Sequence, residues 1–278
     1  MTKKITLEDH LHEAQASFDA ASNPRLVEIM RSALTHIYAF VEETKLTREE
    51  WAAGIEFLTA VGQKCDDVRQ EFILLSDTLG VSMLVEMLNQ MPSDVATDPT
   101  VFGPFHVPGA PELAMGSSIA PEGNNGEPLV FSGTVRDAKG APLEGARLDV
   151  WQVAPNGLYD VQDPASPPMS YRGVFETGAD GTFEIHATRP VDYEIPTDGP
   201  VGKMLRSTGR HAWRPAHTHF MVSCPGYKTL ITHAFDADSP HLGRDAVFGV
   251  RESLIIDMNG GRATFNVVLD SLLPGVAP

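Results

Sequence analysis

The sequence contains little cysteine, few positive charges and no long apolar run. Its two cysteines, Cys65 and Cys224, stand far apart in a chain of 278 residues, which is no disulfide framework and fits a reducing setting. Lys and Arg total 21 against 37 Asp and Glu, and a net charge of −16 argues against nonspecific binding to nucleic acid or to an anionic membrane. No apolar run approaches the roughly 20 residues of a membrane-spanning helix, and the first residues lack an apolar signal core. We therefore expect a cytoplasmic protein with no nucleic-acid partner and no membrane span.

Apolar residues are plentiful, at 42% of the chain, which excludes a largely disordered protein. In residues 1–91 their spacing is helical. Asn23 and Pro24 are a cap and a first helical residue, and Thr47 with Glu50 forms a capping box for the next helix. A third helical stretch runs from about residue 66 to 90, interrupted near Gly80. One apolar face of the first long helix consists of Leu26, Ile29, Met30, Ala33, Leu34, Ile37, Tyr38 and Val41.

The pattern changes after Met91. Residues 92–128 are rich in Pro and Gly and are expected to form a linker that covers the active site. From Leu129 onward short strands alternate with turns, and the turn 179–181 is typical of a hairpin. Expected strands cover 129–136, 146–153, 175–177, 182–187, 217–224, 229–236, 254–257 and 263–269. The predicted fold class is α+β by segment, with a helical domain over 1–91 followed by an all-β sandwich over 129–278.

A histidine pair is the sharpest local signal of chemistry. His217 and His219 lie two positions apart in an expected strand, so both imidazoles point to one face and can reach one ion. A pair of this kind is weak evidence by itself, because it is more often surface or hydrogen-bonded. Arg214, three residues before the pair, strengthens the case for a metal site. A cation beside a metal ion is unfavourable unless an anionic substrate or intermediate lies between them.

The remaining ligands are open at this point. A zinc hydrolase would add a third histidine or a carboxylate, and a ferrous oxygenase would add one carboxylate, for which Glu184, Asp236 and Asp238 are candidates. Two tyrosines, Tyr159 and Tyr193, stand instead in distinctive Pro- and Gly-containing loops. Two phenolates and two imidazoles suit a ferric ion, Fe(III), whose charge lowers the pKa of a tyrosine enough for it to bind as phenolate.

Residues 129–270 resemble the catalytic domain of the intradiol ring-cleavage dioxygenases. The matching stretches are residues 149–152 (DVWQ), 157–160 (GLYD), 193–202 (YEIPTDGPVG) and 214–219 (RPAHTH). The helical half also resembles the N-terminal dimerisation domain of the catechol and hydroxyquinol branch. The resemblance implies Tyr159 and His217 as equatorial ligands of Fe(III), and Tyr193 and His219 as axial ligands. It further implies two catalytic residues: Tyr193, which takes up a substrate proton, and Arg214, which faces the substrate ring.

Within this family, residues 69–77, 101–105 and 245–250 look like the hydroxyquinol branch. The substrate-binding residues implied there are Leu74, Asp77, Val101, Phe102, Gly103, Pro104, Phe105, Ile195, Pro196 and Val247. Asp77 is either a helix-face carboxylate without a ligand role or the acceptor for a third ring hydroxyl, which plain catechol lacks. The expected reaction converts hydroxyquinol and dioxygen to 3-hydroxy-cis,cis-muconate, which tautomerises to maleylacetate. His233 stands where catechol-specific members have glutamine, and His106 stands where an aromatic residue is common.

Other functions remain open on the sequence alone. Within the family, catechol or a chlorocatechol is the alternative substrate, giving cis,cis-muconates. Outside it, residues 133–146 also resemble noncatalytic prealbumin-like binding modules, and a colourless zinc or iron enzyme with two histidines and a carboxylate is a third reading. The resemblance further implies a homodimer through the N-terminal helices, where a phospholipid is a candidate ligand.

Overall fold

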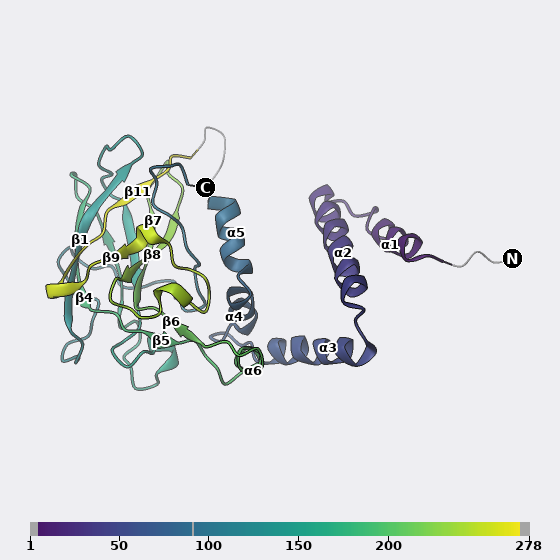
Figure 1. The fold of residues 1–278 in the computed structure, drawn as a ribbon. Coiled ribbons are helices and arrows are strands. Elements are labelled where there is room, and N and C mark those ends of the chain that lie inside the picture. The colour runs from purple at the N-terminus through teal and green to yellow at the C-terminus, as the bar shows by residue number, and fades with distance from the viewer. Residues whose placement is uncertain (1–4, 91, 273–278) are drawn as a thin grey trace. The chain divides into compact units, whose positions relative to one another are not determined.

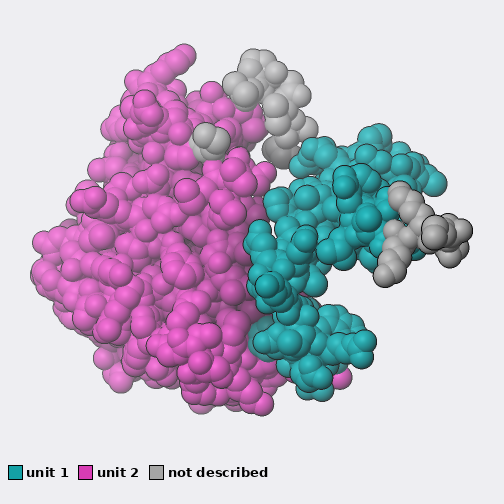
Figure 2. Space-filling view, turned by 45° about the vertical axis from the view of Figure 1, so that its right-hand side comes forward, with its two compact units in different colours: residues 1–59 teal, residues 60–278 magenta. Residues whose placement is uncertain are grey.

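A computed structural model describes residues 5–90 and 92–272, and the chain divides into two compact units, residues 1–59 and 60–278 (Figure 2). The boundaries expected at residues 91 and 128 stay a prediction, and the first of them falls on Met91, outside the described residues. Within the described ranges, no helix has the length and apolar character needed to cross a bilayer.

The first unit is helical, as its apolar periodicity predicts. Asn23 caps the long second helix by accepting from two backbone N–H groups, and Pro24 is its first residue. The capping box also forms: the Thr47 N–H donates to Glu50 (2.9 Å) and the Glu50 N–H to the Thr47 hydroxyl (3.2 Å). The helices are α1 (Leu7–Ala16), α2 (Pro24–Thr44) and α3 (Arg48–Gln63), the last of which continues into the second unit.

The described part of the second unit holds three further helices. The break expected near Gly80 is confirmed, since Gly80 has φ +76° and separates α4 from α5. The predicted helix start near residue 66 is wrong. The Asp66 carboxylate accepts from the N–H groups of Val68 and Arg69, and these hydrogen bonds fold the stretch before α4 into a turn. The helix α6 lies in a region where the sequence pattern predicts only β structure. The bounds are α4 (Glu71–Thr78), α5 (Val81–Gln90) and α6 (Pro200–Ser207).

Most strands in the described part of this unit belong to two main sheets (Figure 1). In the first, β4, β10 and β11 all pair with β1; the second has the order β3-β2-β7-β8-β9; and β5 and β6 form a small ribbon. The bounds are β1 (Pro128–Asp137), β2 (Arg147–Trp151), β3 (Arg172–Glu176), β4 (Thr182–Thr188), β5 (Tyr193–Glu194), β6 (Trp213–Arg214), β7 (His217–Ser223), β8 (Leu230–Asp236), β9 (Ile255–Ile256), β10 (Arg262–Thr264) and β11 (Val267–Leu269). Short 3₁₀ turns lie at Asp160–Gln162, Leu242–Arg244, Glu252–Leu254 and Asn259–Gly261.

The two main sheets share one apolar core, which confirms the predicted sandwich. Phe131 of β1 and Phe220 of β7 meet edge to face there, with ring centroids 5.5 Å apart. The predicted hairpin at residues 179–181 is wrong, because β3 pairs with β2 and β4 pairs with β1. The turn carries the chain between sheets instead, and its Gly181 carbonyl accepts from the N–H of Val135.

Strand pairing brings distant residues to one end of the sandwich. In the second sheet, β7 lies between β2 and β8, so that His219 stands opposite Trp151 on one side and His233 on the other. In the small ribbon, Tyr193 of β5 pairs with Arg214 of β6.

Candidate metal centre

Four side chains that the sequence predicts as metal ligands converge in one buried place. His217 and His219 share a face of β7, with their Nε2 atoms 3.2 Å apart. The Tyr159 hydroxyl lies 3.0 Å from Nε2 of His219 and 3.4 Å from the hydroxyl of Tyr193. All four side chains are at most 4% exposed. Two phenol oxygens and two imidazole nitrogens therefore face one another at the distances expected of donors that could share one ion.

The turn that carries Tyr159 is fixed by polar contacts on both sides. Its N–H donates to the Gln162 side chain at 3.0 Å. The next residue, Asp160, forms a buried ion pair with Arg172, with Nε–Oδ1 at 2.9 Å. The Phe105 ring stacks on that of Tyr159, with centroids 4.6 Å apart. This tyrosine is thus held by a preformed turn and not by a flexible loop.

Both histidines are oriented through Nδ1, the nitrogen remote from the tyrosines. Nδ1 of His217 lies 2.6 Å from the Pro215 carbonyl oxygen, and Nδ1 of His219 lies 2.8 Å from Nε2 of His233. Trp151 stacks on the His219 ring at 4.6 Å. His233 was not among the predicted site residues, although its pairing register opposite His219 places it there.

The electrostatic setting suits a cation. Burial lowers the pKa of His217 and of His219 well below the usual value, so both imidazoles are neutral and able to act as ligands. Burial, together with Tyr193, raises the pKa of the Tyr159 hydroxyl well above 10. A positive ion among these donors would oppose that rise and favour the phenolate. The donor set, two phenols and two neutral imidazoles, fits a ferric ion.

Arg214 supplies a permanent positive charge at the edge of this cluster. It is 3% exposed, and its Nη1 lies 3.4 Å from the Tyr193 hydroxyl. Burial alone would lower the pKa of the guanidinium, but Asp245 and the two tyrosines raise it, so the group stays charged. Asp245 holds it at 3.1 and 3.3 Å and also accepts from the N–H groups of Val247 and Gly249. The arginine is thereby fixed against the tyrosine.

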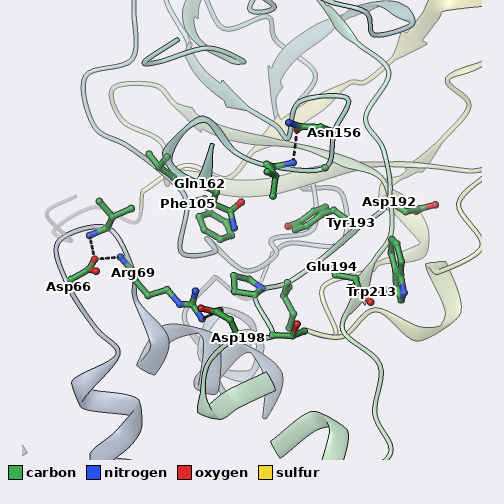
Figure 3. Close-up of a pocket in the computed structure, with 17 residues that line it drawn as sticks. Asp66, Arg69, Phe105, Asn156, Gln162, Asp192, Tyr193, Glu194, Asp198 and Trp213 are labelled. Atoms are coloured by element: carbon green, nitrogen blue, oxygen red, sulfur yellow. Dashed lines mark hydrogen bonds and ion pairs between the residues drawn. The ribbon is translucent and has the colours of Figure 1, made fainter. Parts of the chain in front are cut away.

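A cavity of about 640 Å³ leads to Tyr193 (Figure 3). Its lining includes three of the predicted substrate-binding residues, Phe105, Ile195 and Pro196. In the figure the rings of Phe105 and Tyr193 lie in the middle of the view, with Arg69 and Asp198 paired below them at 2.9 Å. A molecule in this cavity would therefore meet the rings of Phe105 and Tyr193 among side chains that are mostly polar or charged.

The other predicted substrate-binding residues are not part of this lining. Val101 packs near Gly249 and Arg214, and Gly103 is so close to His219 that a Cβ there would lie 3.4 Å from its ring. Phe102 contacts Trp151 edge to face at 5.8 Å. Leu74, Asp77 and Val247 are buried, and Pro104 lies between Gly103 and Phe105.

Asp77 is an unusual buried carboxylate. It is 2% exposed, and its Oδ1 has no hydrogen-bond partner among the described residues. Burial raises its pKa, and the Ser82 hydroxyl and the charge of Arg214 partly oppose that rise. A buried acceptor without a partner, within the field of Arg214, is suited to a donor brought by a ligand.

The carboxylates considered as alternative ligands lie elsewhere. Asp236 and Asp238 both pair with Arg189, and Glu184 is an exposed side chain that contacts His186. The structure therefore joins the histidine pair to two tyrosines and not to these three carboxylates. His106 does not contact the histidine pair directly. Its Nε2 lies 3.0 Å from the Asp149 carboxylate, and its ring packs against Trp151, which in turn stacks on His219.

Comparisons with known proteins agree along nearly the whole chain. The family described as "Dioxygenase" matches residues 101–271, and "Catechol dioxygenase N terminus" matches residues 23–97. A 6-chlorohydroxyquinol 1,2-dioxygenase of Cupriavidus pinatubonensis is 51% identical over 84% of this chain and 85% of its own length. A hydroxyquinol 1,2-dioxygenase of a Rhizobium species is 50% identical over 84% of this chain and 80% of its own. The crystal structure of hydroxyquinol 1,2-dioxygenase from Pseudomonas putida is 47% identical, has a TM-score of 0.88, and is matched over 96% of this chain and 99% of that one.

Proposed function

The chain belongs to the intradiol ring-cleavage dioxygenases, and from this premise we propose that it opens the ring of hydroxyquinol (benzene-1,2,4-triol) with dioxygen. The product is 3-hydroxy-cis,cis-muconate, which tautomerises to maleylacetate. The observation that carries the proposal is the meeting of two tyrosines, two histidines and a charged arginine beside a cavity that Tyr193 lines. Asp77 is a further buried carboxylate, and its Oδ1 has no hydrogen-bond partner among the described residues.

The metal is a non-haem iron, and the proposed ligands are Tyr159, Tyr193, His217 and His219. Their oxygen and nitrogen donors favour the ferric state over the ferrous. When bound, Fe(III) supplies Lewis acidity and an acceptor for electron density, which makes a bound aromatic diol reactive toward dioxygen.

Tyr193 and Arg214 are the proposed catalytic residues. Tyr193 faces the cavity, so its oxygen can accept a proton from a substrate hydroxyl that arrives there. Arg214 lies 3.4 Å from the same oxygen, where its charge stabilises negative charge that develops on the ring. Asp245 keeps the guanidinium oriented before the substrate arrives, which avoids reorganisation during the reaction.

The proposed substrate pocket consists of Leu74, Asp77, Val101, Phe102, Gly103, Pro104, Phe105, Ile195, Pro196 and Val247. Its apolar members favour an aromatic ring and exclude water, and Asp77 selects for a third hydroxyl. Catechol or a chlorocatechol has no such hydroxyl and would leave Oδ1 of Asp77 unpaired, at a cost of roughly 1–3 kcal/mol. This difference supports hydroxyquinol over the catechol alternative.

Assembly and location are further parts of the proposal. The helical unit leaves apolar side chains of α2 exposed, among them Leu26, Ile29, Ile37 and Phe40, which supports a homodimer through the N-terminal helices. A phospholipid is a candidate ligand of that interface. A cytoplasmic location remains a prediction from the low cysteine content.

Metal analysis combined with a visible spectrum tests the proposed centre. Charge transfer from phenolate to ferric ion would colour the purified protein red, with about one iron per chain. A colourless protein that holds zinc or no metal would support the hydrolase or binding-module alternatives. Turnover of hydroxyquinol, catechol and chlorocatechols, compared on the same preparation, then ranks the three substrates.

A further inference from the structure

A third histidine, His233, contacts the proposed metal ligand His219. His233 of β8 is fully buried and stands directly opposite His219 of β7 in the strand register. Its Nε2 lies 2.8 Å from Nδ1 of His219, and the two rings are nearly perpendicular, with centroids 4.1 Å apart. The ring is therefore held against a proposed metal ligand by a short hydrogen bond.

His217, His219 and His233 form a cluster whose ligand atoms lie within 4.8 Å of one another, which suggests a three-histidine metal site. The contacts argue against that arrangement. His219 turns its Nε2 toward His217 and Tyr159, at 3.2 and 3.0 Å, and its Nδ1 toward His233. These two nitrogens stand on different edges of the ring, so an ion bound at Nε2 with the tyrosines lies away from His233.

The two proposed histidine ligands differ in how their protons are placed. Nδ1 of His217 meets the Pro215 carbonyl, which can only accept, so this imidazole carries its proton on Nδ1 and keeps the lone pair of Nε2 free. Nδ1 of His219 meets another imidazole, which can accept or donate. If His233 donated, His219 would carry its proton on Nε2 and could not bind a metal there.

We propose that His233 is a positioning residue that accepts the proton of His219 Nδ1 in a hydrogen bond and thereby keeps Nε2 of His219 free for the metal. His233 then carries its own proton on its buried Nδ1, which has no hydrogen-bond partner among the described residues. The inference rests on the proposed metal centre and adds to it the residue that selects the tautomer of one ligand. Groups that orient a metal-bound histidine in this way typically change metal affinity by roughly 10–100-fold when they are removed.

Three substitutions of one residue separate hydrogen bonding from packing. His233→Gln keeps an acceptor oxygen of similar reach, His233→Asn is one methylene shorter, and His233→Leu has no acceptor. Phe235→Leu is the packing control, because the Phe235 ring contacts both His217 and His233 and makes no hydrogen bond through its side chain. The measurement is the rate at which a chelator removes iron from the purified, substrate-free protein, together with the position of the charge-transfer band.

We expect His233→Leu and His233→Asn to release iron roughly 10–100-fold faster than the wild type, with a shifted band. His233→Gln and Phe235→Leu should stay close to the wild type in both measurements. Wild-type release from His233→Leu, or equally fast release from His233→Gln, would overturn the inference, as would fast release from Phe235→Leu. If His233→Leu fails to fold, the rates of iron release from His233→Gln and His233→Asn decide the question by themselves. A wild-type protein that holds no iron would instead refute the proposed centre.

Discussion

Removing the carboxylate of Asp77 should narrow the preference for hydroxyquinol over catechol. Oδ1 of this residue is buried and lacks a hydrogen-bond partner within the described part of the chain, and the charge of Arg214 acts on it. A third ring hydroxyl would donate to this oxygen, whereas catechol would leave it unpaired. Asp77→Asn keeps the shape but removes the charge, and Asp77→Ala removes the acceptor altogether.

The expected size follows from the kind of hydrogen bond. A bond to a charged acceptor contributes about 1.5–3 kcal/mol, more than a bond between neutral groups. Because about 1.4 kcal/mol corresponds to a tenfold change in rate, the wild type should favour hydroxyquinol by roughly 10- to 100-fold in kcat/KM. Asp77→Asn should reduce this ratio, and Asp77→Ala should reduce it further, mainly by weakening the turnover of hydroxyquinol.

The assay is oxygen uptake with each substrate, at matched iron content, for wild type and both variants. Asp94→Asn is the control, because it removes one negative charge at an exposed position. Iron content should not change in any variant, since Asp77 is not a proposed ligand. If both Asp77 variants kept the wild-type ratio, Asp77 would have no part in recognition, and the preference would come from pocket shape alone.

Three further predictions concern the ligands, the assembly and pH. Tyr159→Phe, His217→Ala and His219→Ala should each lose iron or its colour, and full iron with full activity in any of them would refute the ligand set. Deleting residues 1–60 should give a monomer or aggregate by light scattering, because the proposed dimer forms through these helices; a soluble dimer would contradict this. Burial raises the pKa of Asp77 above 3.8, so its ionisation destabilises the fold as pH rises through the raised value. Asp77→Asn should therefore exceed the wild type in unfolding free energy at neutral pH, and the gap should shrink below about pH 4. A gap that denaturant titrations find independent of pH would exclude this cause.

Much of the site could be predicted because its residues stand in short local patterns. The spacing of His217 and His219 places both side chains on one face of any strand, whatever the partner strands are. The loops of Tyr159 and Tyr193 carry stretches that resemble a known family, and the structure brings both hydroxyls to the histidines. The starts of two helices could be predicted for the same reason, because the caps at Asn23 and Thr47 depend only on residues within the next three positions.

The parts that sequence reasoning missed depend on pairing between distant segments. His233 reaches His219 only because β7 and β8 pair in one register, and Asp245 reaches Arg214 across 31 positions of chain. No pattern within one segment specifies either contact, although the register of the expected strands 217–224 and 229–236 could have suggested the first. The hairpin at 179–181 was wrong for a related reason, since a turn motif does not specify which strands its neighbours join.

The most direct test of the central claim is the product formed from hydroxyquinol under ¹⁸O₂ by the purified, iron-containing protein. Intradiol cleavage breaks the bond between the two carbons that carry adjacent hydroxyls, so mass spectrometry should find 3-hydroxy-cis,cis-muconate or maleylacetate with labelled oxygen in its carboxylates. A ring-opened aldehyde would indicate cleavage beside the diol and not within it. Either that aldehyde or unchanged hydroxyquinol would contradict the proposed activity.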